Sequence, residues 1–314
     1  MRLTVLTPSF GRFSQEPIAR SAQLGLEIID RTENHPKTGA DLIEAISDAE
    51  AILVGLDCID AEVFAACPDL KIVAKHGAGV DNIDLAAAAD AGVTVVNTPG
   101  ANAESVADLT LGLLLMGARR IRAAEDSLRS GEWGVFFGTQ LSGKQLGILG
   151  FGRIGREVAK RAAGFGLRIA AFDPFVPDEA IAEAGVTPLP LAEVVAGSEF
   201  LTLHLPGGEE PLITSEHIAS MPAGAGLINA ARGGLVDETA LAEALHSGHL
   251  AFAALDAFAT EPPPADDPLL GAPNLIATPH IGAYSDIANA IMGTWAVEDV
   301  VRVLGGEEPR FPVR

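Results

Sequence analysis

Positive charge is scarce in this sequence. Its 314 residues include 21 lysines and arginines against 42 aspartates and glutamates, which gives a formal charge of −21 at pH 7. The field of such a chain repels phosphate backbones and anionic lipid headgroups. Nucleic-acid binding and membrane-surface binding are therefore disfavoured, and an acidic ligand must be held by a few local cationic groups.

Cysteine and long apolar runs are also scarce. The two cysteines, Cys58 and Cys67, show neither a CxxC pattern nor metal-ligand spacing. We therefore expect small buried thiols in a reducing compartment and no metal site. The longest strongly apolar stretch, Leu109 to Ala118, is far shorter than the roughly 18 residues of a membrane span. The N-terminal run Leu3 to Leu6 is too short for a signal-peptide core, so the sequence predicts a cytoplasmic protein.

The remaining composition is that of a folded chain, with 48% apolar and 20% charged residues and a length typical of about two domains. Short apolar runs alternate with helical patterns, which is typical of βαβ units. The pattern predicts an α/β protein with two doubly wound parallel sheets. The expected strands are Leu3–Leu6, Ala51–Val54, Lys71–Ala74 and Val93–Val96 in the first series, then Gln145–Leu149, Leu167–Phe172, Phe200–Leu203, Gly226–Asn229, Ala251–Leu255 and Leu275–Thr278.

Two helices are expected to join the series. A turn-rich hinge, Asn97 to Ala101, precedes Asn102, which we expect to cap a helix from Glu104 to about Arg120. That helix is apolar on nearly every side and should be buried all round, which requires a second subunit. A later helix, Ser285 to Leu304, is expected to return to the first domain. Its predicted apolar face is formed by Ile287, Ile291, Trp295, Val300 and Leu304.

A glycine motif follows the strand that ends at Leu149. Gly150 permits a tight turn, Gly152 lets a pyrophosphate approach the backbone, and Gly155 lets the next helix pack on the strand. The following strand ends in Asp173, which is placed to accept from both ribose hydroxyls and would repel a 2′-phosphate. NAD is therefore predicted in preference to NADP. The alternatives are a structural glycine turn and a strand-end cap formed by Asp173.

Three residues near strand ends have the types that hydride chemistry on a hydroxy acid needs. Arg232 offers a planar cation for a carboxylate, His280 a base that titrates near neutrality, and Glu261 a partner for the second ring nitrogen. Taken alone, each has an ordinary explanation, namely a surface ion pair for Arg232, a loop histidine for His280 and a solvated loop acid for Glu261.

The segments around these residues resemble the D-2-hydroxyacid dehydrogenase family, in its phosphoglycerate dehydrogenase-like branch. The matching segments stand in the family's order over nearly the whole chain. They are Lys75–Asp84, Asn97–Gly100, Ser105–Ala107, Gly150–Gly155, Asn229–Asp237, Asp256–Phe258 with Glu261 and Pro262, and Thr278–Gly282.

The resemblance implies an NAD-binding Rossmann domain, residues 99–283, inserted into a flavodoxin-like substrate domain made of residues 1–98 and 284–314. It implies Arg232 for the substrate carboxylate and carbonyl, His280 as acid and base, and Glu261 as its partner. It also implies a homodimer through the Glu104–Arg120 helix region. The cofactor contacts that it suggests, besides the glycines and Asp173, are Val106, Arg153, Ile154, His204, Pro206, Ala230, Asp256 and Gly282.

The sequence departs from the family pattern in three places. Many relatives have arginine where this chain has Lys75. The ammonium of lysine is a point charge and lacks the planar, bidentate donors of a guanidinium. The segment Gly207–Pro211 is shorter than usual, which should alter the rim of the cofactor site. The sequence ends soon after Leu304, so we expect no regulatory domain and no feedback through one.

Substrate selection is assigned to a loop after the third expected strand and to the only tyrosine. Lys75, with Gly77, Ala78 and Gly79, forms the expected substrate loop, and Tyr284 follows His280 closely. The alternative for Tyr284 is packing between domains.

The resulting functional prediction is an NAD-dependent oxidoreductase that interconverts a small D-2-hydroxy acid and its 2-oxo acid. Closure of the two domains about the Asn97 hinge and the crossing near Ile281 should exclude water. The substrate prediction leans to 3-phosphoglycerate, with hydroxypyruvate or glyoxylate as the alternative. A function of another class is an NAD(H)-sensing, corepressor-like binding protein.

Overall fold

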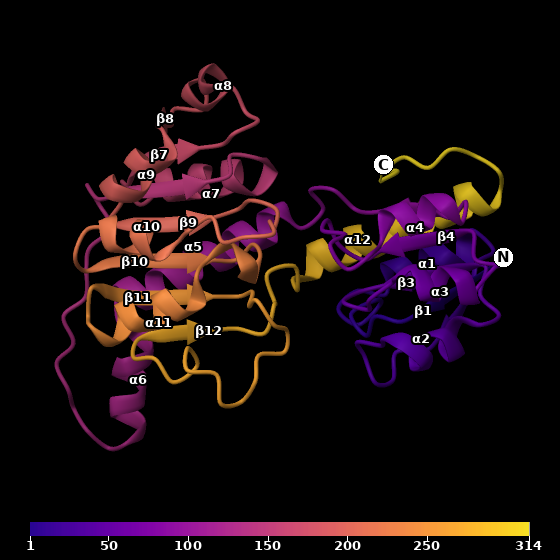
Figure 1. Cartoon of the computed structure of the whole chain (residues 1–314), viewed down its shortest axis with the longest axis horizontal. Coiled ribbons are helices and arrows are strands. Elements are labelled where there is room, and N and C mark those ends of the chain that lie inside the picture. Colours follow the sequence, from indigo (N-terminus) through magenta and orange to yellow (C-terminus); the bar gives the residue numbers. More distant parts are fainter. Residues whose placement is uncertain (314) are drawn as a thin grey trace. The chain divides into compact units, whose positions relative to one another are not determined.

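A computed structural model describes residues 1–313, and the chain divides into two compact units (Figure 1). The first unit comprises Met1–Asn102 together with the chain from Ala283 onward, and the second comprises Ala103–Gly282. The sequence placed these boundaries after residues 98 and 283. Each unit contains one parallel sheet covered by helices, so the predicted α/β class is confirmed.

The first unit has a five-stranded parallel sheet in the order β2-β1-β3-β4-β5, which is the flavodoxin-like order. Its elements are β1 (Arg2–Val5), α1 (Glu16–Gln23), β2 (Glu27–Asp30), α2 (Gly39–Ile46), β3 (Ala51–Val54), α3 (Ala61–Ala66), β4 (Ile72–Lys75), α4 (Leu85–Asp90), β5 (Thr94–Val96) and α12 (Asp286–Leu304). The edge strand β2 is absent from the expected set.

Helix α12 packs on one face of this sheet with only part of the predicted apolar face, since Val300 and Leu304 lie in or against the core cluster. Ala296, Val297 and Val300 join the cluster that contains Ala51 and Leu53 of β3. Ile287, assigned to the apolar face, is 68% exposed. The buried side is rotated because small residues allow closer helix packing. A Cβ at Gly293, for example, would lie 2.6 Å from Cγ of Pro17 in α1.

The second unit has a seven-stranded parallel sheet in the order β12-β11-β10-β9-β6-β7-β8. The reversal of strand order between β6 and β9 is that of the Rossmann fold. Its elements are α5 (Ala103–Ala118), α6 (Ile121–Arg129), β6 (Gln145–Leu149), α7 (Arg153–Ala163), β7 (Arg168–Phe172), α8 (Asp178–Ala182), β8 (Thr187–Pro188), α9 (Leu191–Gly197), β9 (Phe200–Leu203), α10 (Ser215–Ser220), β10 (Ala225–Asn229), a 3-10 turn (Gly233–Leu235), α11 (Glu238–His246), β11 (Leu250–Leu255) and β12 (Leu275–Ala277).

Helix α5 is buried on most of its surface within one chain, and burial of the remaining stripe by a second subunit stays a prediction. Glu104 and Asp108 are exposed and pair with Arg161 of α7 at 3.4 and 2.6 Å. The side chain of Asn102 does not form the expected cap, because its Oδ1 has no hydrogen-bond partner within residues 1–313. Polar spacing of four residues therefore keeps one side of α5 toward solvent.

The two cysteines differ in their surroundings. Cys67 is buried, as expected, whereas Cys58 is exposed because it lies in the loop after β3 rather than in the core. Within the described residues, no helix is both long and apolar enough to cross a membrane.

Candidate active site

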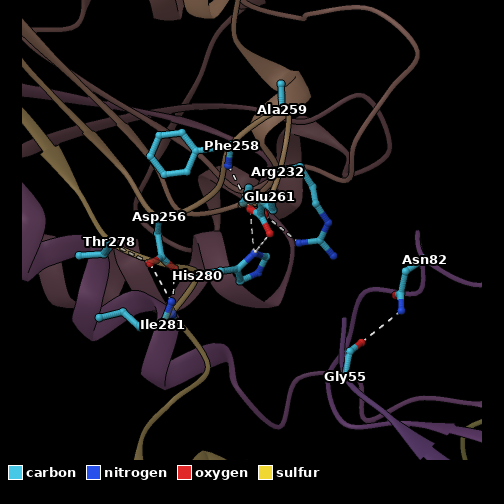
Figure 2. Close-up of polar contacts among 12 residues, drawn as sticks. Gly55, Asn82, Arg232, Asp256, Phe258, Ala259, Glu261, Thr278, His280 and Ile281 are labelled. Atoms are coloured by element: carbon cyan, nitrogen blue, oxygen red, sulfur yellow. Dashed lines mark hydrogen bonds and ion pairs between the residues drawn. The ribbon is translucent and has the colours of Figure 1, made fainter. Parts of the chain in front are cut away.

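Three neighbouring strands of the second unit end in the loops that hold the expected catalytic residues. Arg232 follows β10, Glu261 follows β11 and His280 follows β12. These strands pair in parallel, so their carboxyl ends lie along the same edge of the sheet, where doubly wound sheets bind ligands. Figure 2 shows the three side chains gathered beside one another.

A histidine–carboxylate pair stands at the centre of this group. Nδ1 of His280 lies 2.8 Å from Oε2 and 3.0 Å from Oε1 of Glu261. Burial tends to raise the pKa of Glu261. The hydrogen bond and charge of His280, the Phe258 N–H and the Arg232 charge together hold that pKa below its usual value. An ionised carboxylate only accepts, so Nδ1 carries the hydrogen and Nε2 is left to exchange a proton.

Asp256 organises the loop that presents His280. Its Oδ1 accepts from the Thr278 hydroxyl at 2.6 Å and from the Ile281 N–H at 2.8 Å, while Oδ2 accepts from the Gly282 N–H at 2.8 Å. Burial raises the pKa of Asp256, although these donors oppose the shift. His280 itself has φ +52°, in the left-handed region that non-glycine residues seldom adopt. Bonds on both sides of His280 thus hold an unfavourable backbone conformation.

Arg232 lies in a loop that Asn229 orders. Asn229 Oδ1 accepts from the Ala231 N–H at 3.1 Å, and its Nδ2 donates to the Arg232 carbonyl at 2.7 Å. Nη1 of Arg232 donates to the Ala231 carbonyl at 2.8 Å. The guanidinium is therefore placed by its own loop, near enough to Glu261 to lower the pKa of that carboxyl.

The glycine motif forms a turn suited to a dinucleotide. Gly150 has φ +96°, and a Cβ there would lie 2.5 Å from the His204 carbonyl oxygen. A Cβ at Gly155 would overlap the Gly150 carbonyl oxygen, whereas a Cβ at Gly152 would meet no atom within 4 Å. Gly152 is the N-cap of α7 and forms no side-chain cap. The first N–H groups of α7 are thus without a capping side chain, as an anion-binding helix terminus requires.

Asp173 and His204 stand at the ends of the strands beside that turn. Asp173 accepts from the N–H groups of Phe151 at 2.7 Å, Phe175 at 2.8 Å and Val176 at 3.1 Å, so it does act as a strand-end cap. Because a carboxylate has about four acceptor sites, these three N–H groups do not prevent Asp173 from also accepting from a ribose. The ribose contact stays a prediction. Burial lowers the pKa of His204 to about 3. Its Nδ1 is buried and, among the described residues, has no hydrogen-bond partner, an atom that a bound group would satisfy.

The other predicted cofactor contacts come from segments near the same sheet edge. Arg153 and Ile154 begin α7, Pro206 follows His204, and Ala230 follows β10. Val106 lies beside Gly282, since a Cβ at Gly282 would be 3.3 Å from Val106 Cγ2. The fold, the open helix terminus and the unsatisfied His204 nitrogen fit a dinucleotide.

Besides Arg232 and His280, the predicted substrate residues belong to the first unit. Lys75 ends β4, and its Nζ donates to the Gly55 carbonyl and, at 2.7 Å, to Asn82 Oδ1. Asn82 donates to the same carbonyl at 3.1 Å, as Figure 2 shows. The loop of Gly77, Ala78 and Gly79 is held at two carbonyls, Gly77 by Thr98 and Ala78 by Asn97. Tyr284 precedes α12. Lys75 is therefore part of an ordered polar network.

The Rossmann strand order, the glycine turn and the histidine–carboxylate pair define a dinucleotide-binding protein of dehydrogenase architecture. Residues 111–282 match the family described as D-isomer specific 2-hydroxyacid dehydrogenase, NAD binding domain. The chain belongs to this family, and the predicted resemblance is confirmed. The match also supports NAD as the cofactor.

Similar proteins cover most or all of the chain. A D-3-phosphoglycerate dehydrogenase of Mycobacterium bovis is 45% identical over 271 residues, 85% of this chain and 51% of that protein. The crystal structure of a Thermus thermophilus protein has a TM-score of 0.88 and 37% identity over 100% of both chains. A glyoxylate reductase from Paecilomyes thermophila has a TM-score of 0.85 and 28% identity over 100% of this chain and 98% of that one. The chain spans about half the length of the curated relatives that it matches.

Two alanine substitutions should separate the binding role of the glycine turn from its structural role. Gly152→Ala has room for the methyl group, so the melting temperature should stay unchanged while NADH binding weakens about tenfold or more. Gly155→Ala forces its methyl group against the Gly150 carbonyl and should lower the melting temperature. Fluorescence titration with NADH and thermal unfolding measure the two effects. Unchanged NADH affinity in Gly152→Ala would show that this terminus does not hold the cofactor.

Proposed function

We propose that the chain catalyses the reversible NAD-linked oxidation of a small D-2-hydroxy acid to its 2-oxo acid. The observation that carries the proposal is the contact of 2.8 Å between His280 Nδ1 and Glu261 Oε2, in the same group as Arg232. Membership of the family supports it. The α7 terminus and Asp173 would hold NAD, which would supply the hydride chemistry when bound.

Each of the three side chains has a separate task in the reductive direction. The planar guanidinium of Arg232 orients the substrate carboxylate and polarises the carbonyl. Nε2 of protonated His280 donates a proton to the carbonyl oxygen. The ionised Glu261 stabilises the imidazolium and fixes the ring, because it accepts from Nδ1–H.

The substrate proposal rests on relatives and on the first unit. A relative named D-3-phosphoglycerate dehydrogenase makes 3-phosphoglycerate the first acid to test, and the glyoxylate reductase makes glyoxylate and hydroxypyruvate the next. We assign substrate binding to Lys75, to the backbone of Gly77, Ala78 and Gly79, and to Tyr284. A panel of 2-hydroxy acids with NAD and of 2-oxo acids with NADH, followed at the nicotinamide absorbance, tests the substrate proposal. Tight NADH binding without turnover of any acid would support an NAD(H) sensor instead.

Replacing the acid and base should stop chemistry without releasing the cofactor. His280→Ala is expected to lower kcat by roughly 10² or more, while the NADH dissociation constant stays within about twofold. His246→Ala, which removes an exposed histidine of α11, is the matched control and should turn over normally. Turnover retained by His280→Ala would remove His280 from the mechanism.

Removing the Lys75 ammonium should weaken substrate binding and leave cofactor binding unchanged. Lys75→Ala is expected to raise KM for the preferred acid about tenfold, which corresponds to one charge-assisted hydrogen bond, with NADH binding unchanged. Lys71→Ala is the control, because Lys71 is exposed and pairs only on the surface with Glu50 at 3.0 Å. If KM for every acid in the panel were unchanged in Lys75→Ala, the proposed role of that ammonium would be wrong.

We further propose that the protein is a homodimer built on the region of α5 and α6. We name the residues 121–137 the apolar arm, because it exposes large side chains. Trp133 is 90% exposed, Phe137 86% and Val135 78%, with Leu128 at 59% and Ile121 at 46%. Monomers seldom expose so many large apolar side chains in one short segment, and a second copy of this chain is the occupant that would also cover α5.

The oligomeric state gives the test of the apolar arm. The wild-type protein should elute as a dimer in size-exclusion chromatography with light scattering, and the double variant Trp133→Asp, Phe137→Asp as a monomer. Phe13→Asp, at an exposed aromatic residue outside the apolar arm, should remain dimeric. A monomeric wild-type protein at micromolar concentration would refute the dimer.

A further inference from the structure

The turn that carries Glu261 is held by a second carboxylate. Phe258 donates its N–H to Oε1 of Glu261 at 3.0 Å, and the next residue, Ala259, donates its N–H to Oε1 of Glu238 at 2.7 Å. Two successive N–H groups of one turn thus meet two different carboxylates. One belongs to the partner of His280, and the other belongs to the first residue of α11.

Glu238 comes from the segment that also carries Arg232. The chain runs from Arg232 through the 3-10 turn Gly233–Leu235 and the N-cap Asp237 into α11. At the start of this segment, a Cβ on Gly233 would overlap the Phe258–Ala259 peptide, so the two backbones are in direct contact. The Arg232 loop and the Glu261 turn are therefore in contact at Gly233 and are joined by the hydrogen bond from the Ala259 N–H to Glu238.

The surroundings of Glu238 disfavour an ionised carboxylate, and only a hydrogen bond to the turn compensates for this. Burial raises the pKa of Glu238, and the charges of Asp267 and Glu261 add to the shift, whereas only the Ala259 N–H opposes it among these causes. Two neighbouring acids disfavour the ionised form of Glu238, so contact with solvent alone does not explain why this carboxylate lies here. Its contribution is the hydrogen bond that it accepts from the turn.

We propose that Glu238 is a positioning residue for the His280–Glu261 pair. By accepting the Ala259 N–H, it fixes the turn from Phe258 to Glu261, and thereby the carboxylate that sets the imidazole. Glu238 contacts neither His280 nor, on this proposal, the substrate. The inference rests on the proposed function for its catalytic consequence, but not for its structural one.

Two variants and a control separate the bond from the charge. Glu238→Gln keeps an oxygen acceptor of the same reach, whereas Glu238→Ala removes it. Glu243→Ala removes an exposed carboxylate from the same helix and is the control. We expect kcat to fall about 10- to 100-fold in Glu238→Ala, with KM and the NADH dissociation constant changed less than about threefold. Glu238→Gln and Glu243→Ala should keep most of the activity.

The pH profile provides the readout that a loss of folding would not give. In Glu238→Ala the pH dependence of kcat should shift relative to that of the wild type, because Glu261 no longer fixes the position of the His280 imidazole. In Glu238→Gln it should stay near that of the wild type. A Glu238→Ala variant with wild-type kcat, or a Glu238→Gln variant as impaired as Glu238→Ala, would overturn the proposal. So would a parallel loss of NADH binding and melting temperature, which indicates general destabilisation.

Amide hydrogen exchange tests the same inference without turnover. The Phe258 amide reports on Glu261, because that carboxylate is its acceptor. Its exchange should accelerate about tenfold or more in Glu238→Ala and remain slow in Glu238→Gln and Glu243→Ala. If the wild type turned over no acid while these rates behaved as expected, the proposed function alone would fail. Unchanged Phe258 exchange in Glu238→Ala would refute the positioning role alone.

Discussion

The proposed catalytic group of this protein is organised around one hydrogen bond, from His280 Nδ1 to the Glu261 carboxylate. The bond places the ring hydrogen on Nδ1 and leaves Nε2 without one. It also requires Glu261 to stay ionised although its side chain is only 27% exposed, a requirement met by the His280 contact, the Phe258 N–H and the Arg232 charge. An imidazole without this constraint could rotate and change tautomer, and its proton would not be delivered in a fixed direction.

The surrounding loops are ordered by carboxylates and amides that accept backbone N–H groups. Asp256 holds both sides of the left-handed His280, Asn229 orders the Arg232 loop, and Glu238 holds the turn before Glu261. Each acts from the end of a strand or the start of a helix, which are rigid positions in a parallel sheet. The fold thus supplies precision through short polar links between neighbouring loops rather than through the loops themselves.

The sequence predicted the parts of this arrangement that have a local signature. The strand before Gly150, the glycine spacing and the helix after it identified the dinucleotide turn, and residue type with strand-end position selected Arg232, Glu261 and His280. Asp256 was expected as a cofactor contact, and its bonds to the His280 loop were not foreseen, since they join residues far apart in sequence. Glu238 was missed for the same reason. Its one signal was its place at the start of a helix after the Arg232 loop.

The errors in the fold have comparable physical causes. Strand β2 has only two apolar residues between two acids, since it lies at an edge and pairs on one side only. The face of α12 was assigned correctly at Val300 and Leu304 but wrongly at Ile287, because close packing against α1 buries Gly293 instead. Cys58 was taken as buried from its residue type, but it lies in a loop. In each case tertiary contacts outweighed the local pattern.

The tautomer of His280, measured from its imidazole ¹⁵N chemical shifts in the neutral form of the ring, tests the role of the His280–Glu261 hydrogen bond most directly. We expect the hydrogen on Nδ1 in the wild-type protein, with Nε2 unprotonated, and a mixture of the two tautomers in Glu261→Ala. A wild-type ring with its hydrogen on Nε2, or a tautomer that does not respond to Glu261→Ala, would contradict it.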